Sequence, residues 1–345
     1  MKPTYHSIFY KNSQNMHEIE NESISLVVTS PVYPIIDLWD NLFSKMNPKI
    51  KDALDVQDGS LAFELMHQEL DKTWAEVYRV LKSGGIACIN VGDAVRTIGK
   101  EFRLYANHSR ILDSCLKLGF SSLPEIIWRK PTNAPNKFMG SGMLPPGAYI
   151  TLEHEFILIL RKKGKREFKT VKEKLNRQES SYFWEERNTW FSDLWFLKGA
   201  PQSLNNKTRE RSAAFTFELA YRLVNMFSVK DDTVLDPFLG TGTTTLAAMA
   251  SRRNSIGYEL DPGFRNVVNQ RIGGLLEFAN SYIEDRLKRH EYFVRERITQ
   301  NKQLKYINKH HNFPVVTKQE VNLVIEKVKS VKQGDSNLFE VIYEK

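Results

Sequence analysis

The stretch Val234–Ala248, VLDPFLGTGTTTLAA, decides the fold of this chain. Its first residues predict the end of a short apolar strand, and the run that begins at Thr243 predicts the first turns of a helix. Gly240 and Gly242 allow the sharp turn between them, since glycine adopts backbone angles that other residues avoid. At such a turn the N–H groups of a helix start can face a nucleotide-like cofactor. Many glycine turns hold no cofactor, so the flanking sequence has to decide.

Predicted strands and helices alternate on both sides of this turn. Strands are predicted at residues 24–29, 86–91, 125–128, 156–160 and 255–258, and helices at 61–81, 105–118, 211–227, 244–251 and 262–299. Residues 35–60 show no clear period and are predicted as a loop, and residues 323–342 are predicted as a hairpin. The alternation is typical of an α/β fold with a doubly wound, mostly parallel sheet.

Composition narrows the class of protein. With 41% hydrophobic and 26% charged residues the chain is typical of a globular protein. Its 49 lysines and arginines against 41 acidic residues give a net charge of +8, which favours a polyanionic partner such as nucleic acid. Cys88 and Cys115 lie in apolar or helical runs, as in a reducing, cytoplasmic compartment. No metal-ligand spacing and no membrane-spanning run occur, and we expect neither a metal site nor a membrane partner.

A rigid elbow, Ser30-Pro31-Val32-Tyr33-Pro34, follows the predicted strand 24–29. Two prolines around a tyrosine can neither continue a strand nor begin a helix interior. In open α/β sheets ligands bind where strands end in this way. A stiff turn with a packed tyrosine explains the elbow alone equally well.

Residues 161–178 hold nine basic and two acidic side chains, and seven aromatic residues follow between Tyr182 and Phe196. This pattern suits contacts with DNA phosphates and grooves. The candidate contact residues are Lys162, Lys163, Lys165, Arg166 and Lys169. A solvated basic loop beside a packed aromatic cluster is the alternative. The nearby Glu153-His154-Glu155 is interpreted as the polar start of strand 156–160.

Thr29–Tyr33 and Asp236–Gly242 together resemble the two signature motifs of the amino-group DNA methyltransferases. The first is similar to the catalytic motif Ser/Asp/Asn-Pro-Pro-Tyr/Phe, and the second to the motif that binds S-adenosylmethionine. Their order is that of the beta class, whose Rossmann-like sheet is circularly permuted, and the resemblance spans roughly residues 20–275. It implies S-adenosylmethionine as cofactor, double-stranded DNA as substrate and a prokaryotic restriction–modification system with a separate endonuclease.

The serine that opens the catalytic motif is similar to enzymes that methylate N4 of cytosine. The resemblance implies that Ser30 Oγ and the Pro31 carbonyl accept the amine hydrogens, that Tyr33 stacks on a flipped base, and that the methyl moves directly. Val32 departs from the motif, which has a second proline there. The alternatives are adenine-N6 methylation and a non-catalytic module that binds nucleic acid.

On the cofactor side the resemblance implies contacts from Asp236, Pro237, Phe238, Gly240, Gly242, Thr243 and Glu259. Glu259 lies 17 positions after Gly242 (259 − 242), an interval that suits an acid bound to a ribose diol. Asp93, at the end of the adjacent strand, is a weaker candidate.

Four segments follow from this assignment. They are a catalytic half (1–160), a target-recognition region (161–205), a cofactor half (206–275) and a C-terminal extension (276–345). The protein is expected to act as a monomer or a homodimer associated with the nucleoid.

Overall fold

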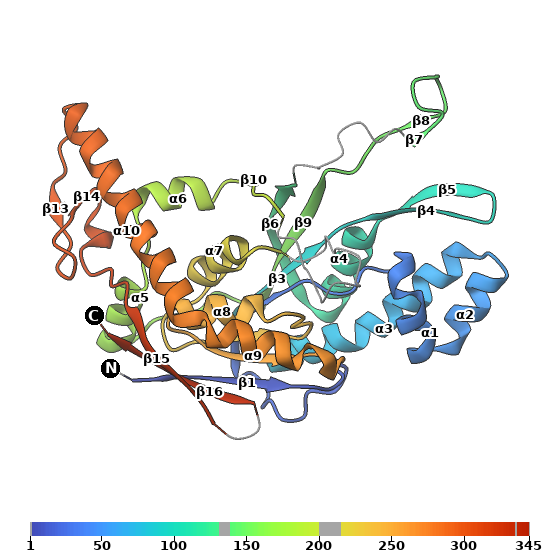
Figure 1. Cartoon of the computed structure of the whole chain (residues 1–345), viewed down its shortest axis with the longest axis horizontal. Helices are drawn as coiled ribbons and strands as arrows, with labels where there is room; N and C mark the ends of the chain where they lie inside the picture. The colour runs from blue at the N-terminus through green and yellow to red at the C-terminus, as the bar shows by residue number, and fades with distance from the viewer. Residues whose placement is uncertain (1, 131–138, 200–214, 335–336, 345) are drawn as a thin grey trace.

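A ten-stranded sheet forms the centre of the protein in the computed structural model, which describes residues 2–130, 139–199, 215–334 and 337–344 (Figure 1). In sheet order its strands are β10 (Leu194–Phe196), β6 (Phe120–Arg129), β9 (His154–Lys162), β3 (Leu81–Val91), β2 (Ile24–Thr29), β11 (Thr233–Asp236), β12 (Asn254–Tyr258), β1 (Thr4–Phe9), β16 (Leu338–Glu344) and β15 (Lys327–Gln333). The five strands from β3 to β1 pair in parallel, whereas β9, β16 and β15 pair antiparallel with their neighbours. The expected mostly parallel α/β sheet is therefore confirmed.

Helices cover both faces of the sheet. The helices α3 (Gly59–Val80) and α4 (Asn107–Leu118) bury their apolar sides in one core, and α7 (Phe217–Phe227) and α8 (Thr243–Ala250) in the other. Side chains alternate between the two faces of a strand. Leu26 and Val28 of β2 accordingly belong to the second core, and Val27 between them to the first. This double covering explains why central strands read as continuous apolar runs.

The strand β11 inserts between β2 and β12, although it follows β2 by about two hundred residues. Leu26 pairs with Val234, and Val27 with Leu235, in parallel register. The elbow after β2 and the glycine turn after β11 therefore leave the sheet side by side. We call this side, where β2, β3, β11 and β12 end, the carboxyl edge.

Several elements depart from the sequence-based prediction. Residues 35–60 contain two helices, α1 (Asp40–Met46) and α2 (Pro48–Asp55), and a 3-10 turn at Asp37–Trp39. Both helices are too short to show a helical period, but Asn47 caps α2 and Pro48 starts it, a recognisable signal. The long predicted helix breaks at Gly274 into α9 (Arg265–Gly273) and α10 (Leu275–Thr299), after a 3-10 turn at Pro262–Phe264.

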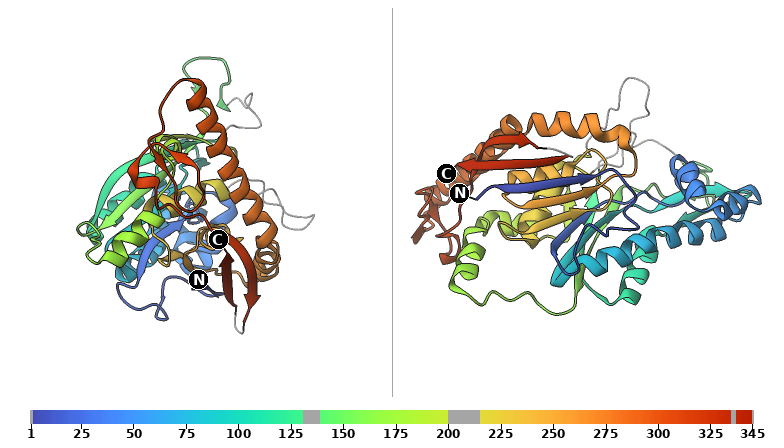
Figure 2. Two further views of the ribbon diagram at one scale, coloured as in Figure 1. Left: turned by 90° about the vertical axis from the view of Figure 1, so that its left-hand side faces the viewer. Right: turned by 90° about the horizontal axis from the view of Figure 1, so that it is seen from below.

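Two hairpins and a first strand were not predicted. The hairpins are β4 (Ala94–Ile98) with β5 (Glu101–Tyr105), and β7 (Met139–Gly140) with β8 (Ala148–Tyr149). Both project away from the sheet (Figure 1). The strand β1 pairs with β12 on one side and with β16 of the predicted C-terminal hairpin on the other, which brings the chain ends close together (Figure 2).

The C-terminal extension packs against the segment 161–205. That segment contains α5 (Val171–Glu179) and α6 (Trp184–Trp190), and the extension adds β13 (Tyr306–Ile307), β14 (Pro314–Val315) and a 3-10 turn at Lys318–Glu320. Arg286 of α10 pairs with Glu186 of α6 at 2.6 Å, and Phe183 stacks on His290. Phe183, Trp190 and Trp195 are buried. These three aromatic residues therefore form core, as the alternative interpretation held.

The two cysteines are buried core residues, as expected. Among the described residues, no helix combines the length and apolar character needed to cross a membrane.

Candidate active site

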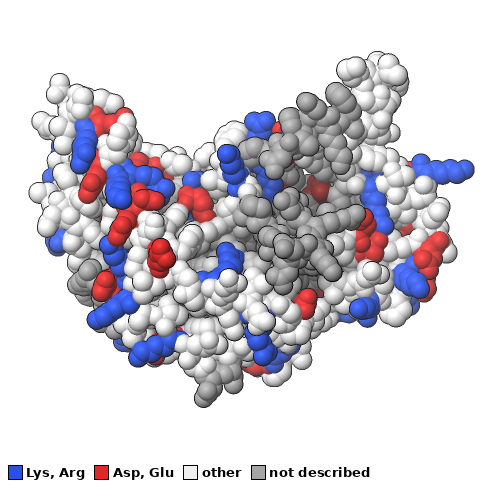
Figure 3. Space-filling model, in the orientation of Figure 1, with Lys and Arg blue, Asp and Glu red and all other residues white. Residues whose placement is uncertain are grey.

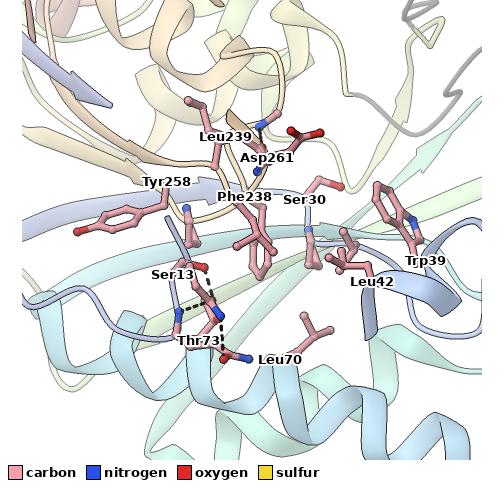
Figure 4. Close-up of a pocket in the computed structure, with 18 of the residues that line it drawn as sticks. Ser13, Ser30, Trp39, Leu42, Leu70, Thr73, Phe238, Leu239, Tyr258 and Asp261 are labelled. Carbon is pink, nitrogen blue, oxygen red and sulfur yellow. Dashed lines mark hydrogen bonds between the residues drawn. The ribbon is translucent and has the colours of Figure 1, made fainter. Parts of the chain in front are cut away.

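A cavity of about 400 Å³ opens at the carboxyl edge between the elbow and the glycine turn (Figure 4). Its walls come from the loop after β1, the elbow, α1, α3, the glycine turn and the end of β12. Among the lining residues are Asn12, Ser13, Ser30, Pro31, Val32, Trp39, Leu42, Thr73, Pro237, Phe238, Gly240, Thr243, Glu259 and Asp261. A mostly apolar cavity of this size with a few polar groups suits a small-molecule cofactor.

The glycine turn has the geometry that the sequence predicts. Gly240 and Gly242 have φ of +54° and +80°, which are left-handed values that favour glycine. The helix α8 begins at Thr243, but its hydroxyl does not cap the helix; it accepts a hydrogen bond from Arg271 at 3.1 Å. Thr243 and Gly240 line the cavity, while Gly242 does not.

Glu259 presents its carboxylate to this turn. One oxygen accepts the N–H of Gly240 at 2.8 Å, and the other accepts the N–H of Asp261 at 2.9 Å. An ionised carboxylate has about four acceptor positions, so two backbone bonds orient the group and leave acceptor capacity toward the cavity that it lines.

Asp236 connects the two motifs from behind the cavity. It is 2% exposed and accepts hydrogen bonds from the Thr29 hydroxyl at 2.6 Å and the Phe238 N–H at 3.1 Å. Burial raises the pKa of Asp236 to about 6, and the hydrogen bond from Thr29 opposes that rise. Asp236 does not line the cavity, whereas Pro237 and Phe238 do. Phe238 lies at the centre of the lining residues in Figure 4.

The elbow presents Ser30 and Pro31 to the cavity but not Tyr33. The Tyr33 ring is 4% exposed and packs against Gly92, where an added Cβ would lie 3.0 Å from the ring. Val32, the departure from the family motif, lines the cavity instead. In this structure the expected stacking face of Tyr33 is therefore covered.

The Tyr33 hydroxyl belongs to a buried polar network behind Ser30. It donates to Glu155 at 3.0 Å and lies 3.1 Å from Ser30 Oγ. Asn90 Nδ2 donates to Glu155 at 2.6 Å, and Lys130 forms an ion pair with the same carboxylate. Burial raises the pKa of the Tyr33 phenol well above its usual value, and the charge of Glu155 adds to this rise.

Sequence reasoning missed Asn90, Lys130 and Glu155. Asn90 is a buried amide in the otherwise apolar run 86–91, and that contrast was a usable signal. Glu155 does stand at the polar start of a strand, as predicted, but its side chain turns inward. Nothing local could have shown that it meets Tyr33, 122 residues away.

The basic candidates lie away from this site. The strand β9 runs antiparallel to β3, pairing Phe156 with Val91 and Arg161 with Ile86. Its last residues, and the basic segment after them, therefore leave the sheet at the edge opposite the cavity. Figure 1 shows α5 on that opposite side.

The assignment of Lys162 to DNA is wrong. This lysine is 3% exposed, and its ammonium donates to the Leu81 carbonyl at 2.7 Å. Arg166 is held by Asp232 through two hydrogen bonds, of 2.5 and 2.9 Å. Lys163, Lys165 and Lys169 are exposed.

Asp93 also serves the scaffold. It accepts the backbone N–H of His108 at 3.1 Å and pairs with the imidazole of the same residue at 2.8 Å, at the start of α4. Within the described ranges no group of three histidine, cysteine or acidic residues could hold a metal ion.

Comparisons with known proteins agree with this geometry. Residues 24–270 match the N6/N4 DNA methylase family. The type II methyltransferase M.MthZI of Methanothermobacter thermautotrophicus is 52% identical over 344 residues, which cover 99% of this chain and 96% of that protein. The type II methyltransferase M.MjaI of Methanocaldococcus jannaschii is 49% identical over 285 residues, or 78% and 92% of the two chains.

A solved structure is similar in both fold and sequence. The DNA modification methylase TTHA0409 of Thermus thermophilus, complexed with S-adenosyl-L-methionine, has a TM-score of 0.60 and 31% identity. The match covers 77% of this chain and 92% of that one.

Proposed function

Since this chain belongs to the N6/N4 DNA methylase family and is a type II DNA methyltransferase that uses S-adenosylmethionine, we propose that it methylates the exocyclic N4 amine of cytosine. The observation that carries this proposal is Ser30, whose hydroxyl lines the cavity as the first residue of the elbow. A serine in this position is similar to the cytosine-N4 enzymes. The non-catalytic module is excluded by the family to which the chain belongs.

The cavity fits the cofactor of the family. Glu259 offers an oriented carboxylate for a ribose diol, and the glycine turn brings backbone groups close to the cavity floor. When bound, S-adenosylmethionine supplies an electrophilic methyl group on a sulfonium. Among the residues predicted to bind it, we propose that Pro237, Phe238, Gly240, Thr243 and Glu259 form the contact surface. Asp236 and Gly242 hold the turn that presents them.

The elbow has the groups that an amine requires. An aryl amine is a weak nucleophile because its lone pair is delocalised into the ring. Two acceptors, Ser30 Oγ and the Pro31 carbonyl, would hold the two amine hydrogens so that the lone pair points at the methyl group. Positioning of this kind supplies most of the rate enhancement in a direct transfer. The amine is paired in duplex DNA, so the base has to leave the stack to reach the cavity.

We place the DNA against the carboxyl edge. The last residue of β6 and the first of β9 both lie at this edge, so the segment 130–153 with its hairpin projects beside the cavity. The tip of this hairpin exposes Met143 and Leu144, and Phe102 of the other hairpin stacks on Tyr149. The surface is concave between this arm and the arm formed by the end of α10 (Figure 3).

The methylated nucleoside tests the proposed base. Duplex DNA treated with the protein and S-adenosylmethionine should yield N4-methylcytosine when it is digested to nucleosides and analysed by mass spectrometry. N6-methyladenine as the only product would overturn the assignment to cytosine and leave the enzyme class intact.

The basic segment offers a test of the DNA position. Neutralising Lys163, Lys165 and Lys169 together should change the affinity for duplex DNA by less than about twofold, because the three lie at the opposite edge of the sheet. Fluorescence anisotropy at several salt concentrations measures this. A DNA affinity that falls about tenfold or more, together with a shallower salt dependence, would return the segment to the interface.

A further inference from the structure

We propose that Glu155 is a positioning residue of the methyl transfer, acting through Tyr33 to orient the Ser30 hydroxyl and to take up the proton that the amine releases. This inference rests on the proposed role of Ser30 and does not depend on which base is methylated. It arises from the buried network of Ser30, Tyr33, Asn90 and Glu155, of which only Ser30 lines the cavity.

The direction of the hydrogen bonds follows from the carboxylate. Ionised glutamate can only accept hydrogen bonds, and the ion pair with Lys130 favours the ionised form. Tyr33 has a single hydroxyl proton, and Glu155 at 3.0 Å takes it. In the 3.1 Å contact between Tyr33 and Ser30, the proton must therefore come from Ser30.

Asn90 shows that Glu155 dominates the network. Its Nδ2 donates to Glu155 at 2.6 Å, while its Oδ1 is buried and finds no hydrogen-bond partner in the described part of the chain. An unpaired buried acceptor costs about 1–3 kcal/mol. The reversed amide would place that oxygen against the carboxylate, so this orientation is the better of the two.

The same orientation prepares Ser30 for the amine. Its proton points to Tyr33, and Asn90 Nδ2 lies 3.4 Å from the serine oxygen. The serine oxygen retains acceptor capacity on the side that lines the cavity. A serine hydroxyl without this constraint could rotate and donate instead. Glu155 thus fixes Ser30 as an acceptor through one intervening phenol.

The network also balances the proton of the reaction. After the methyl group has bonded to the amine nitrogen, that nitrogen carries one proton too many. The N–H bond breaks as Ser30 Oγ takes this proton, the serine proton passes to the Tyr33 oxygen, and the tyrosine proton passes to Glu155. Each oxygen in the chain ends neutral, and Glu155 holds the proton until solvent removes it. Proton transfer to a positioned group typically contributes about 10²–10⁴-fold to a rate.

A double-mutant cycle tests the inference. The variants are Glu155→Gln, Tyr33→Phe and the two combined, and the readout is the single-turnover transfer of labelled methyl groups to duplex DNA. Each single variant should slow the transfer by about tenfold or more. The double variant should be no slower than the slower single variant, because Glu155 acts only through Tyr33.

Two controls separate positioning from folding. Glu186→Gln removes a buried carboxylate that is paired with Arg286, so it matches the loss of an ion pair and should leave the transfer rate unchanged. Calorimetry should show affinities of the variants for S-adenosylmethionine and for DNA within about twofold of the wild type. Tyr33→Phe keeps the Glu155–Lys130 pair and must be slow by itself if Glu155→Gln does not fold.

An unchanged rate in Glu155→Gln or in Tyr33→Phe would overturn the inference. Independent, additive losses in the double variant would also overturn it, because Glu155 would then act by another route. If Ser30→Ala retained full activity, the proposed role of the elbow would fail. If Ser30→Ala were inactive while Glu155→Gln were fully active, only the role of Glu155 would fail.

Discussion

Replacing Ser30 by alanine should lower the rate of methyl transfer by about 10²–10³-fold, the loss typical when one preorganised hydrogen-bonding group is removed from an active site. Ser30 is the only elbow side chain with a hydroxyl on the cavity, since the Tyr33 hydroxyl is buried. Without its acceptor the amine would lose one of the two bonds that orient its lone pair. Single-turnover methylation of duplex DNA measures the effect.

Binding of the cofactor should survive this change, because Ser30 is proposed to contact the amine. The affinity for S-adenosylmethionine, measured by calorimetry, should stay within about twofold of the wild type. Ser25→Ala is the matched control. Ser25 is a buried serine near the other end of the same strand and donates to Asp232 at 3.0 Å. A comparable loss of activity in both variants would show that Ser30 matters for folding and not for transfer.

Replacing Glu259 by alanine should weaken the binding of S-adenosylmethionine by about 10²-fold or more. A hydrogen bond to a charged group contributes about 1.5–3 kcal/mol, and two such bonds to a ribose diol exceed the 2.8 kcal/mol that a hundredfold change requires. Glu259 lines the cavity and is held against it by the Gly240 N–H at 2.8 Å. Calorimetry with wild type and variant measures the change.

The same carboxylate also anchors the glycine turn, so the test needs a ligand that separates the two effects. Adenosine and 2′,3′-dideoxyadenosine differ only in the ribose hydroxyls. The wild type should prefer adenosine by about tenfold or more, and Glu259→Ala should bind both equally. A preference that survives in the variant would mean that Glu259 acts on the turn alone.

The order of the two motifs was sufficient to predict the sheet. The apolar run 24–29 is β2, and residues 233–236 form the strand before the glycine turn. Local chemistry determines both, because a buried parallel strand needs a continuous apolar run and the turn needs left-handed backbone angles at Gly240 and Gly242. The hairpins β4–β5 and β7–β8 were not predicted, since they bury too little apolar surface to leave a pattern.

The basic segment shows how composition can mislead about position. Nine cations in residues 161–178 suggested a DNA surface. The antiparallel course of β9 takes this segment to the edge opposite the cavity. It also buries Lys162 under backbone carbonyls. The charge of a side chain is a local property, but the edge at which it emerges depends on the direction of its strand.

The sequence by itself determined the mostly parallel sheet, the glycine turn, the elbow and the cofactor class, because each of these follows from residues that are neighbours along the chain. Only the tertiary structure decided that Tyr33 is buried, that Asp236 stands behind the cavity, and that Glu155 completes the network behind Ser30. Tyr33 and Glu155 are 122 positions apart, and Thr29 and Asp236 are 207 apart. Contacts over such separations form only when the strands take their places in the sheet, and no local pattern records them.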